Sequence, residues 1–122
     1  MERIEKFELD GKVFFYYDLS GFETNDDFIK FIEAAQEQIV KCDYNSLHTV
    51  TNIEGIRFDS ETKEIVAGWM TRNGPYVKYG AIIGIDGIKK MMVNMILTIS
   101  GRKNITFAST KEQAIEWLLK QK

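Results

Sequence analysis

Hydrophobic residues are most concentrated between residues 80 and 100, in a short run followed by a longer one. Residues 80–85 read Gly-Ala-Ile-Ile-Gly-Ile, and a short run without polar side chains is typical of a strand buried on both faces. Residues 87–100 predict a helix that is apolar on nearly every side. We expect the other elements of the chain to be arranged around this strand and helix.

Two short strands are predicted near the N-terminus. Residues 4–9 and 12–17 flank the pair Asp10-Gly11, and Asp-Gly between two such runs is a strong signal for a β-hairpin. The second run is aromatic and suits a half-buried strand. The first carries several charged residues, which suits the edge of a sheet.

Helical spacing follows the hairpin. Thr24 is a suitable N-cap, and Asp26 and Asp27 favour the first turn of a helix through the helix dipole. Apolar residues then recur at intervals of three and four until the pattern ends near Lys41, which predicts an amphipathic helix. These apolar residues are Phe28, Phe31, Ile32, Ala35 and Ile39.

The middle of the chain predicts a strand and a second helix. Residues 47–51 form the strand, in which His48 and Val50 share one face because side chains alternate. Asp59 or Ser60 caps a helix over residues 61–72. The sequence Asn-Gly-Pro at residues 73–75 ends that helix.

The C-terminal part predicts one more strand and one more helix. Residues 105–107 form the strand, and Thr110 with Gln113 makes a capping-box pattern at the start of the helix. The order ββ-α-β-α-β-α-β-α implies an α/β fold with a single mixed, mostly parallel sheet covered by about four helices. The length of 122 residues fits one domain over residues 1–122.

The charge is unevenly distributed along the chain. The net charge is -2, but residues 1–61 carry 6 basic and 14 acidic side chains (−8), and residues 62–122 carry 10 basic and 4 acidic ones (+6). Two interpretations of this asymmetry are open. In the first, the two halves pack together and their charges mix over the surface of one domain. In the second, the basic residues form a patch that binds an anionic ligand. The basic residues form no dense run with interleaved aromatic residues, which disfavours nucleic-acid binding. These residues are Lys78, Lys89, Lys90, Arg102 and Lys103.

Cysteine usage and hydropathy predict a cytoplasmic protein. Cys42 is the only cysteine, so no disulfide framework is expected. The N-terminus lacks the apolar region of a signal peptide. The longest apolar segment, residues 91–99, is interrupted by Asn94 and is too short to span a bilayer.

Few residues suggest catalysis or metal binding. His48 is the only histidine, and no nucleophile near it in the sequence suggests a catalytic triad. One histidine and one cysteine are too few for a structural metal site. We therefore expect no enzyme activity, no metal and no cofactor.

The glycines around residue 84 lack the spacing of a nucleotide-binding turn. Such a turn has the pattern G-x-G-x-x-G between a strand and a helix. Asp86 would also place a negative charge where the phosphate has to lie. We expect Gly84 to permit close packing of helix against sheet, and Asp86 to cap the helix that follows.

Asp59 and Ser60 form a candidate regulatory site at the predicted start of the second helix. Both residue types are favoured as helix caps, so capping is one interpretation. The other is a serine that is phosphorylated at a helix N-terminus, where the dipole stabilises the phosphate and the added charge repels an acidic partner.

The helix over residues 87–100 is the candidate binding surface. It carries more apolar residues than one amphipathic stripe holds, and methionine clusters suit adaptable binding surfaces. Three alternatives account for the surplus: packing against the second helix at Trp69 and Met70, a homodimer face, or a pocket for a lipid-like ligand with Lys89 and Lys90 near its mouth. The candidate contact residues are Lys89, Met91, Met92, Met95, Ile96 and Ile99.

Four segments carry a resemblance to a known family. They are the strand and loop at residues 49–55, the lead-in at 75–78, the strand at 81–84, and the ending at 107–118 with its Ala-x-x-Trp-Leu pattern. Through them the whole chain resembles the STAS-like, SpoIIAA-like family of small bacterial domains, and more loosely the CRAL-TRIO lipid-transfer domains. The resemblance implies a mixed sheet covered by helices, no catalytic apparatus, and a role in binding a protein or a small ligand.

The resemblance also bears on the second helix. In the anti-sigma factor antagonists of this family, a serine just after an aspartate at the start of helix two is the regulatory switch, and Asp59-Ser60 falls at that place. Glu61 and Thr62 stand where the family has a small residue and a glycine.

Three hypotheses for function follow from these observations. The first is a non-enzymatic regulatory module that binds a protein partner, as a homodimer. The second is a carrier of a lipid-like or other amphipathic small ligand. The third, which the sequence supports least, is an enzyme that uses His48.

Overall fold

The computed structural model describes residues 3–56, 59–99 and 103–121. The strands are β1 (Ile4–Leu9), β2 (Lys12–Asp18), β3 (Leu47–Asn52), β4 (Val77–Ile83) and β5 (Ile105–Phe107). The helices are α1 (Asn25–Ile39), α2 (Ser60–Asn73), α3 (Gly87–Ile99) and α4 (Lys111–Lys120), with a short 3-10 helix η1 (Gly74–Tyr76) before β4.

The five strands form one mixed sheet in the order β1-β2-β3-β4-β5. β1 pairs with β2 in antiparallel register, and β2, β3, β4 and β5 are parallel neighbours. This confirms the predicted α/β fold with an N-terminal hairpin and four helices. The middle strand of the sheet is β3, and the apolar strand β4 lies between β3 and β5.

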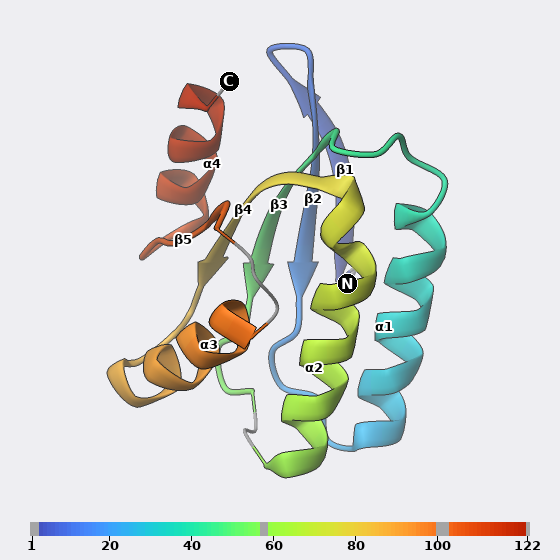
Figure 1. Cartoon of the computed structure of the whole chain (residues 1–122), viewed down its shortest axis with the longest axis vertical. Coiled ribbons are helices and arrows are strands. Elements are labelled where there is room, and N and C mark those ends of the chain that lie inside the picture. Colours follow the sequence, from blue (N-terminus) through green and yellow to red (C-terminus); the bar gives the residue numbers. More distant parts are fainter. Residues whose placement is uncertain (1–2, 57–58, 100–102, 122) are drawn as a thin grey trace.

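The helices cover the two faces of the sheet unequally. The strands follow one another across the sheet in chain order, so crossovers of the same hand bring the connecting helices to the same face. Figure 1 shows α1 and α2 side by side in front of the sheet, α3 crossing near the lower end of the strands, and α4 apart from them. The helix α4 packs on the opposite face, with its own hydrophobic cluster.

Alternation along the strands supplies both hydrophobic clusters. In β2, Phe14 and Phe15 are both buried but belong to different clusters, because successive side chains point to opposite faces. Phe15 packs in the larger cluster with α1, α2 and α3, and Phe14 lies in the smaller one beneath α4. In β3, Val50 shares the smaller cluster, whereas Leu47 joins the larger one, as predicted for this strand.

The turn residues have the backbone conformations that their sequence predicts. Asp10 and Gly11 both have positive φ, of 51° and 74°, which a two-residue hairpin turn of this type requires. Gly84 also has a positive φ of 79°. A Cβ at Gly84 would lie 2.5 Å from Asn52 Oδ1 and 2.7 Å from the Glu54 backbone nitrogen. Gly84 therefore permits the loop after β4 to approach the loop after β3, rather than the helix–sheet packing that we expected.

Candidate functional site

The inner face of α3 packs into the larger core. Val93 and Leu97 lie one helical turn apart and are 3% and 6% exposed. Both belong to the same hydrophobic cluster as Trp69 and Met70 of α2. Packing in the layer of α2 therefore accounts for part of the apolar surface of this helix, as one of the three alternatives predicted.

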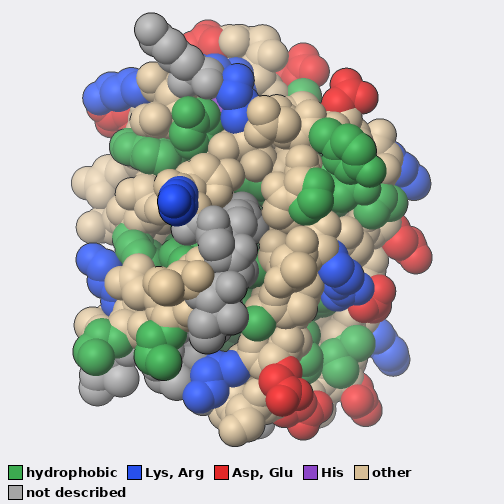
Figure 2. All heavy atoms as spheres, in the orientation of Figure 1, with side chains coloured by type: hydrophobic (Ala, Val, Ile, Leu, Met, Phe, Trp, Pro, Cys, Tyr) green, Lys and Arg blue, Asp and Glu red, His purple; other side chains and the backbone are tan. Residues whose placement is uncertain are grey.

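The outer face of α3 exposes two methionines. Met91 is 70% exposed and Met95 is 63% exposed. They lie one turn apart on the side of the helix away from Val93, because residues two positions apart on a helix point in nearly opposite directions. Hydrophobic side chains emerge at the lower left of Figure 2, where α3 lies in Figure 1. We call Met91 and Met95 the methionine face.

The methionine face includes two of the six candidate residues of this helix, Met91 and Met95. The side chains of Lys89, Met92, Ile96 and Ile99 lie outside the described part of the chain, although their backbone belongs to α3. The methionine face is therefore defined by Met91 and Met95 alone.

The helix that bears the methionine face carries two lysines and no acidic residue. Lys90 is exposed in the first turn of α3, and its Nζ lies 5.2 Å from the centroid of the Phe107 ring. Lys103 is exposed just before β5. The sequence contains no acidic residue between Asp86 and Glu112. The helix α3 therefore carries both exposed apolar side chains and positive charge, and its described ammonium group, that of Lys90, lies at the Phe107 ring.

Asp59 caps α2, and Ser60 is exposed beside it. The Thr62 backbone N–H donates to Asp59 Oδ1 at 2.8 Å, which satisfies one of the free amides at the start of the helix. The predicted cap is thus confirmed, and Asp59 is the residue that makes it. Ser60 is the first residue of α2 and its side chain is solvent-exposed.

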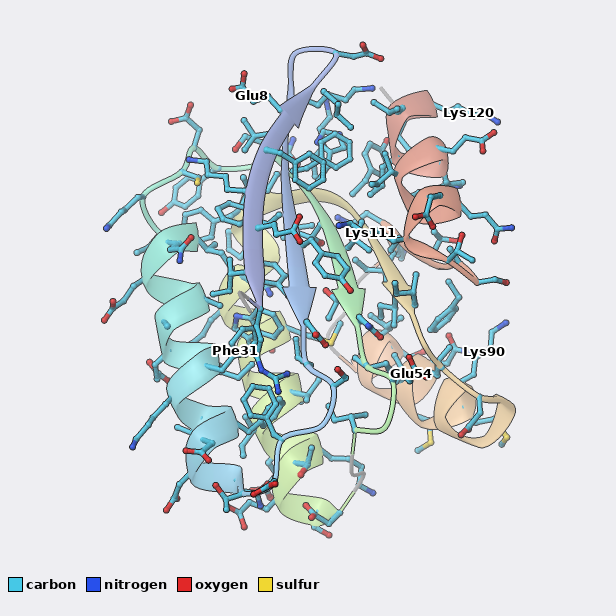
Figure 3. The ribbon with its side chains drawn as sticks, turned by 180° about the vertical axis from the view of Figure 1, so that it is seen from behind. Glu8, Phe31, Glu54, Lys90, Lys111 and Lys120 are labelled. Atoms are coloured by element: carbon cyan, nitrogen blue, oxygen red, sulfur yellow. The ribbon has the colours of Figure 1, made fainter. Side chains whose placement is uncertain are left out.

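A hollow of about 640 Å³ lies at the carboxyl ends of the parallel strands. It is lined from the loops after β3, β4 and β5, by residues that include Glu54, Asp86, Lys90 and Ser109. Figure 3 shows Glu54 and Lys90 at this edge. After β4 the chain continues to α3 on one face of the sheet, and after β5 it continues to α4 on the other face. In open α/β sheets, ligands bind in crevices at points where neighbouring connections go to opposite faces in this way. Sequence reasoning missed it, and the glycines at 55 and 84 were the only local signal.

A smaller cavity lies inside the larger core. It has a volume of about 50 Å³ and lies between the sheet, α2 and α3, with Trp69, Val66 and Val93 among its lining. Trp69 is 2% exposed, and its indole Nε1 has no hydrogen-bond partner among the described residues. One water needs roughly 10–15 Å³, whereas a cavity that binds benzene is about 150 Å³. The cavity therefore fits waters or a very small group.

His48 is buried in the smaller core rather than in a cleft. It is 3% exposed, and its ring lies 5.4 Å from the ring of Phe14 and 6.2 Å from that of Tyr79. Burial lowers the pKa of His48 below its ordinary value, and the nearby charges of Lys12 and Lys78 act in the same direction. Neither ring nitrogen makes a hydrogen bond of ordinary geometry with the described residues, although the Val13 backbone lies close enough to oppose the lowering of the pKa in part. Among the described residues, His48 therefore has no hydrogen-bonded nucleophile or orienting group of the kind that acid–base catalysis by histidine uses.

Residues 3–56, 59–99 and 103–121 contain no group of three or more His, Cys, Asp or Glu side chains that could hold a metal ion. Among the same residues, no helix is both long enough and apolar enough to cross a bilayer.

Comparison of the chain with protein-family models and with curated proteins gave no match. The resemblance to the STAS-like family therefore stays a prediction from the sequence. The fold and the geometry of the surfaces described above are the basis for assigning a function.

Proposed function

We propose that this protein is a non-enzymatic binding and regulatory module of the cytoplasm, and that the outer face of α3 contacts a protein partner. The observation that carries the proposal is the exposure of Met91 and Met95 on one helix face. Large apolar side chains gathered on an exposed face are typical of interaction sites. Methionine suits such a site because its flexible thioether adapts to the shape of a partner.

The energy available from the methionine face limits the kind of contact. Full burial of a methionine side chain contributes about 1.5–3 kcal/mol, so Met91 and Met95 together supply a part of a protein–protein affinity rather than all of it. The helix α3 also carries two lysines and no acidic residue, so its charge is positive. A partner that combines apolar and acidic surface fits this face best.

Ser60 supports the regulatory part of the proposal. The helices α2 and α3 both begin just after parallel strands, so their first turns lie toward the same edge of the sheet. Phosphorylation of Ser60 would add a charge of about −1.5 to −2 at that edge. The phosphate would be stabilised by the N-terminus of α2 and would weaken the binding of an acidic partner.

Site-specific photo-cross-linking in cells tests the proposal. A photoreactive amino acid is placed at position 91 or 95, and at position 44 as a control, because Tyr44 is 72% exposed and belongs to a different surface. We expect a discrete cross-linked product from positions 91 and 95 that is absent for position 44. Equal labelling at all three positions would contradict the proposal.

The second candidate function is the carriage of a small ligand. It is favoured by the unpartnered indole N–H of Trp69 at the wall of the internal cavity, because a buried donor without an acceptor costs free energy that a ligand oxygen would recover. The volume of about 50 Å³ is too small for a lipid chain unless α2 and α3 move apart.

Native mass spectrometry of protein purified from cells tests ligand carriage. We expect an added mass in the wild type that is lost in Trp69→Phe, which removes the N–H and keeps most of the ring. If the wild type shows only the mass of the chain itself under gentle conditions, ligand carriage is contradicted and protein binding remains the proposed function.

A further inference from the structure

The hollow at the carboxyl edge has the place and the size of a small-molecule site. It lies where the connections after β4 and β5 leave for opposite faces of the sheet, which is where open α/β sheets bind ligands. Its volume of about 640 Å³ falls within the usual range for such sites, about 300–1,000 Å³. Neither Met91 nor Met95 is among the residues that line it, so the hollow is separate from the methionine face.

Backbone hydrogen bonds fix the walls of the hollow. The Ile53 N–H donates to the Ile83 carbonyl oxygen at 3.0 Å, which ties the loop after β3 to the end of β4. The Ala108 N–H donates to the Ile82 carbonyl oxygen at 3.0 Å, which ties the loop after β5 to the same strand. The hollow is therefore formed before a ligand enters, and a formed site loses less free energy to the ordering of its own chain on binding.

Opposite charges border the hollow without forming an ion pair. Glu54 contributes a carboxylate and Lys90 an ammonium group, and both side chains are exposed. The ion pairs among the described residues include neither of them. Lys90 Nζ lies 5.2 Å from the centroid of the Phe107 ring, a contact that provides no counter-ion. The carboxylate of Asp86 also belongs to the lining.

Apolar side chains form the part of the lining next to the core. Ile85 and Phe107 are half-buried and pack against the larger hydrophobic cluster. An apolar group of a ligand that covers them is removed from water, which contributes about 25 cal/mol for each Å² of apolar surface. A ligand that fits the hollow therefore carries both charges and an apolar group.

We propose that the hollow at the carboxyl edge binds a free α-amino acid with an apolar side chain. The ammonium group of the ligand faces Glu54, its carboxylate faces Lys90, and its side chain lies against Ile85 and Phe107. A simple anion would be repelled by Glu54 and a simple cation by Lys90, whereas a zwitterion is attracted by both. The inference goes beyond the proposed function, because it adds a small ligand at a surface that the methionine face does not include.

NMR titration of the isotope-labelled protein with L-phenylalanine and with L-leucine tests the site. We expect the largest amide shift changes at residues 54–55, 84–86 and 107–109, which line the hollow. Two analogues each remove one charge, since L-phenylalaninamide lacks the carboxylate and N-acetyl-L-phenylalanine lacks the ammonium group. Each analogue should bind at least about tenfold more weakly than L-phenylalanine, as expected for the loss of one charge-assisted hydrogen bond.

Two substitutions assign the charges to their partners. Glu54→Gln and Lys90→Met lie at exposed positions, so both variants are expected to fold like the wild type. Each should weaken the binding of L-phenylalanine at least about tenfold. In addition, Glu54→Gln should no longer distinguish L-phenylalanine from its N-acetyl form, and Lys90→Met should no longer distinguish it from the amide. Glu37→Gln and Lys30→Met are the matched controls, because both residues are exposed on α1 and neither lines the hollow.

The inference is overturned if neither amino acid changes the shifts of the lining residues at millimolar concentration. It is also overturned if the N-acetyl form or the amide binds the wild type as tightly as L-phenylalanine, because the charge that was removed would then have no partner in the site. Binding of inorganic phosphate in place of the amino acids would show an anion site instead. None of these results bears on the proposed function, since cross-linking at positions 91 and 95 reports on a different surface.

Discussion

His48 is a histidine whose surroundings favour the neutral ring. It lies between aromatic side chains beneath α4, and both Lys12 and Lys78 are near enough to disfavour a positive charge on it. The ring therefore contributes to packing in the smaller core, and its protonation opposes the packing of α4 on the sheet.

The lowered pKa of His48 predicts a pH dependence of stability. In the unfolded chain a histidine takes up its proton near pH 6.5, whereas in the folded protein uptake is delayed to lower pH. Between the two values the unfolded state binds more protons, so the free energy of unfolding falls as the pH drops below about 6.5. One group contributes a slope of at most about 1.4 kcal/mol per pH unit.

Urea unfolding of the wild type and of His48→Phe between pH 5 and 8 measures this dependence. Phe packs with the neighbouring rings and does not titrate, so the free energy of unfolding of the wild type, relative to that of His48→Phe, should increase as the pH rises toward and through 6.5. A difference that is constant with pH would contradict the assignment of a lowered pKa.

Asp59 carries a second prediction at the residue scale. Its carboxylate accepts the Thr62 N–H at 2.8 Å, and removal of such a cap costs about 1 kcal/mol. Asp59→Ala should lower the free energy of unfolding by that amount. Ser60→Ala, at the adjacent exposed position, should change it by less than about 0.5 kcal/mol. Equal effects of the two substitutions would show that Asp59 is not the cap.

Among the elements, α4 depends on a contact from the far end of the chain. Lys12 Nζ of β2 donates to the Leu119 carbonyl oxygen at 2.7 Å and to the Gln121 carbonyl oxygen at 2.9 Å. A positive charge at the C-terminus of a helix also complements the helix dipole. Lys12 thereby fastens the end of α4 to the sheet.

Removal of this contact should loosen α4 selectively. We expect Lys12→Met, which keeps most of the apolar stem, to lower the free energy of unfolding by about 1–2 kcal/mol. Hydrogen exchange at the amides of residues 114–120 should become faster, while that of α1 stays the same. Lys6→Met is the matched control, since Lys6 lies on the opposite face of the same hairpin, with its Nζ 5.8 Å from the Phe15 ring centroid. Equal hydrogen-exchange rates at residues 114–120 in Lys12→Met and Lys6→Met would contradict this role of Lys12.

The elements were predictable because their signals are local. Thr24, Asp59 and Thr110 each accept a hydrogen bond from the backbone N–H three residues later, as their sequence positions indicate. The hollow at the carboxyl edge was not predictable, because Glu54, Lys90 and Ser109 approach one another only through the order of the strands. The face that α4 covers was likewise not encoded in any single segment.

At the scale of the whole molecule, the charge asymmetry of the sequence persists between two helices, since α1 carries four acidic residues and one lysine and α3 carries two lysines and no acidic residue. The acidic first half supplies α1, and the basic second half supplies α3. The exposed methionines, Met91 and Met95, belong to the positively charged helix α3. Although the two halves of the chain pack into one sheet, the difference in charge between α1 and α3 therefore remains.

Methionine oxidation is the most direct test that the outer face of α3 is covered when the protein acts. Met91 and Met95 are exposed in the isolated chain, and Met70, at 9% exposed, is a buried reference within the same protein. Brief peroxide treatment is applied to living cells and to dilute purified protein, and oxidation at each methionine is measured by peptide mass spectrometry. We predict that oxidation at Met91 and Met95, relative to Met70, is several-fold lower in cells than in the dilute protein. Equal relative oxidation in the two samples would show that this face remains open to solvent and would contradict the account.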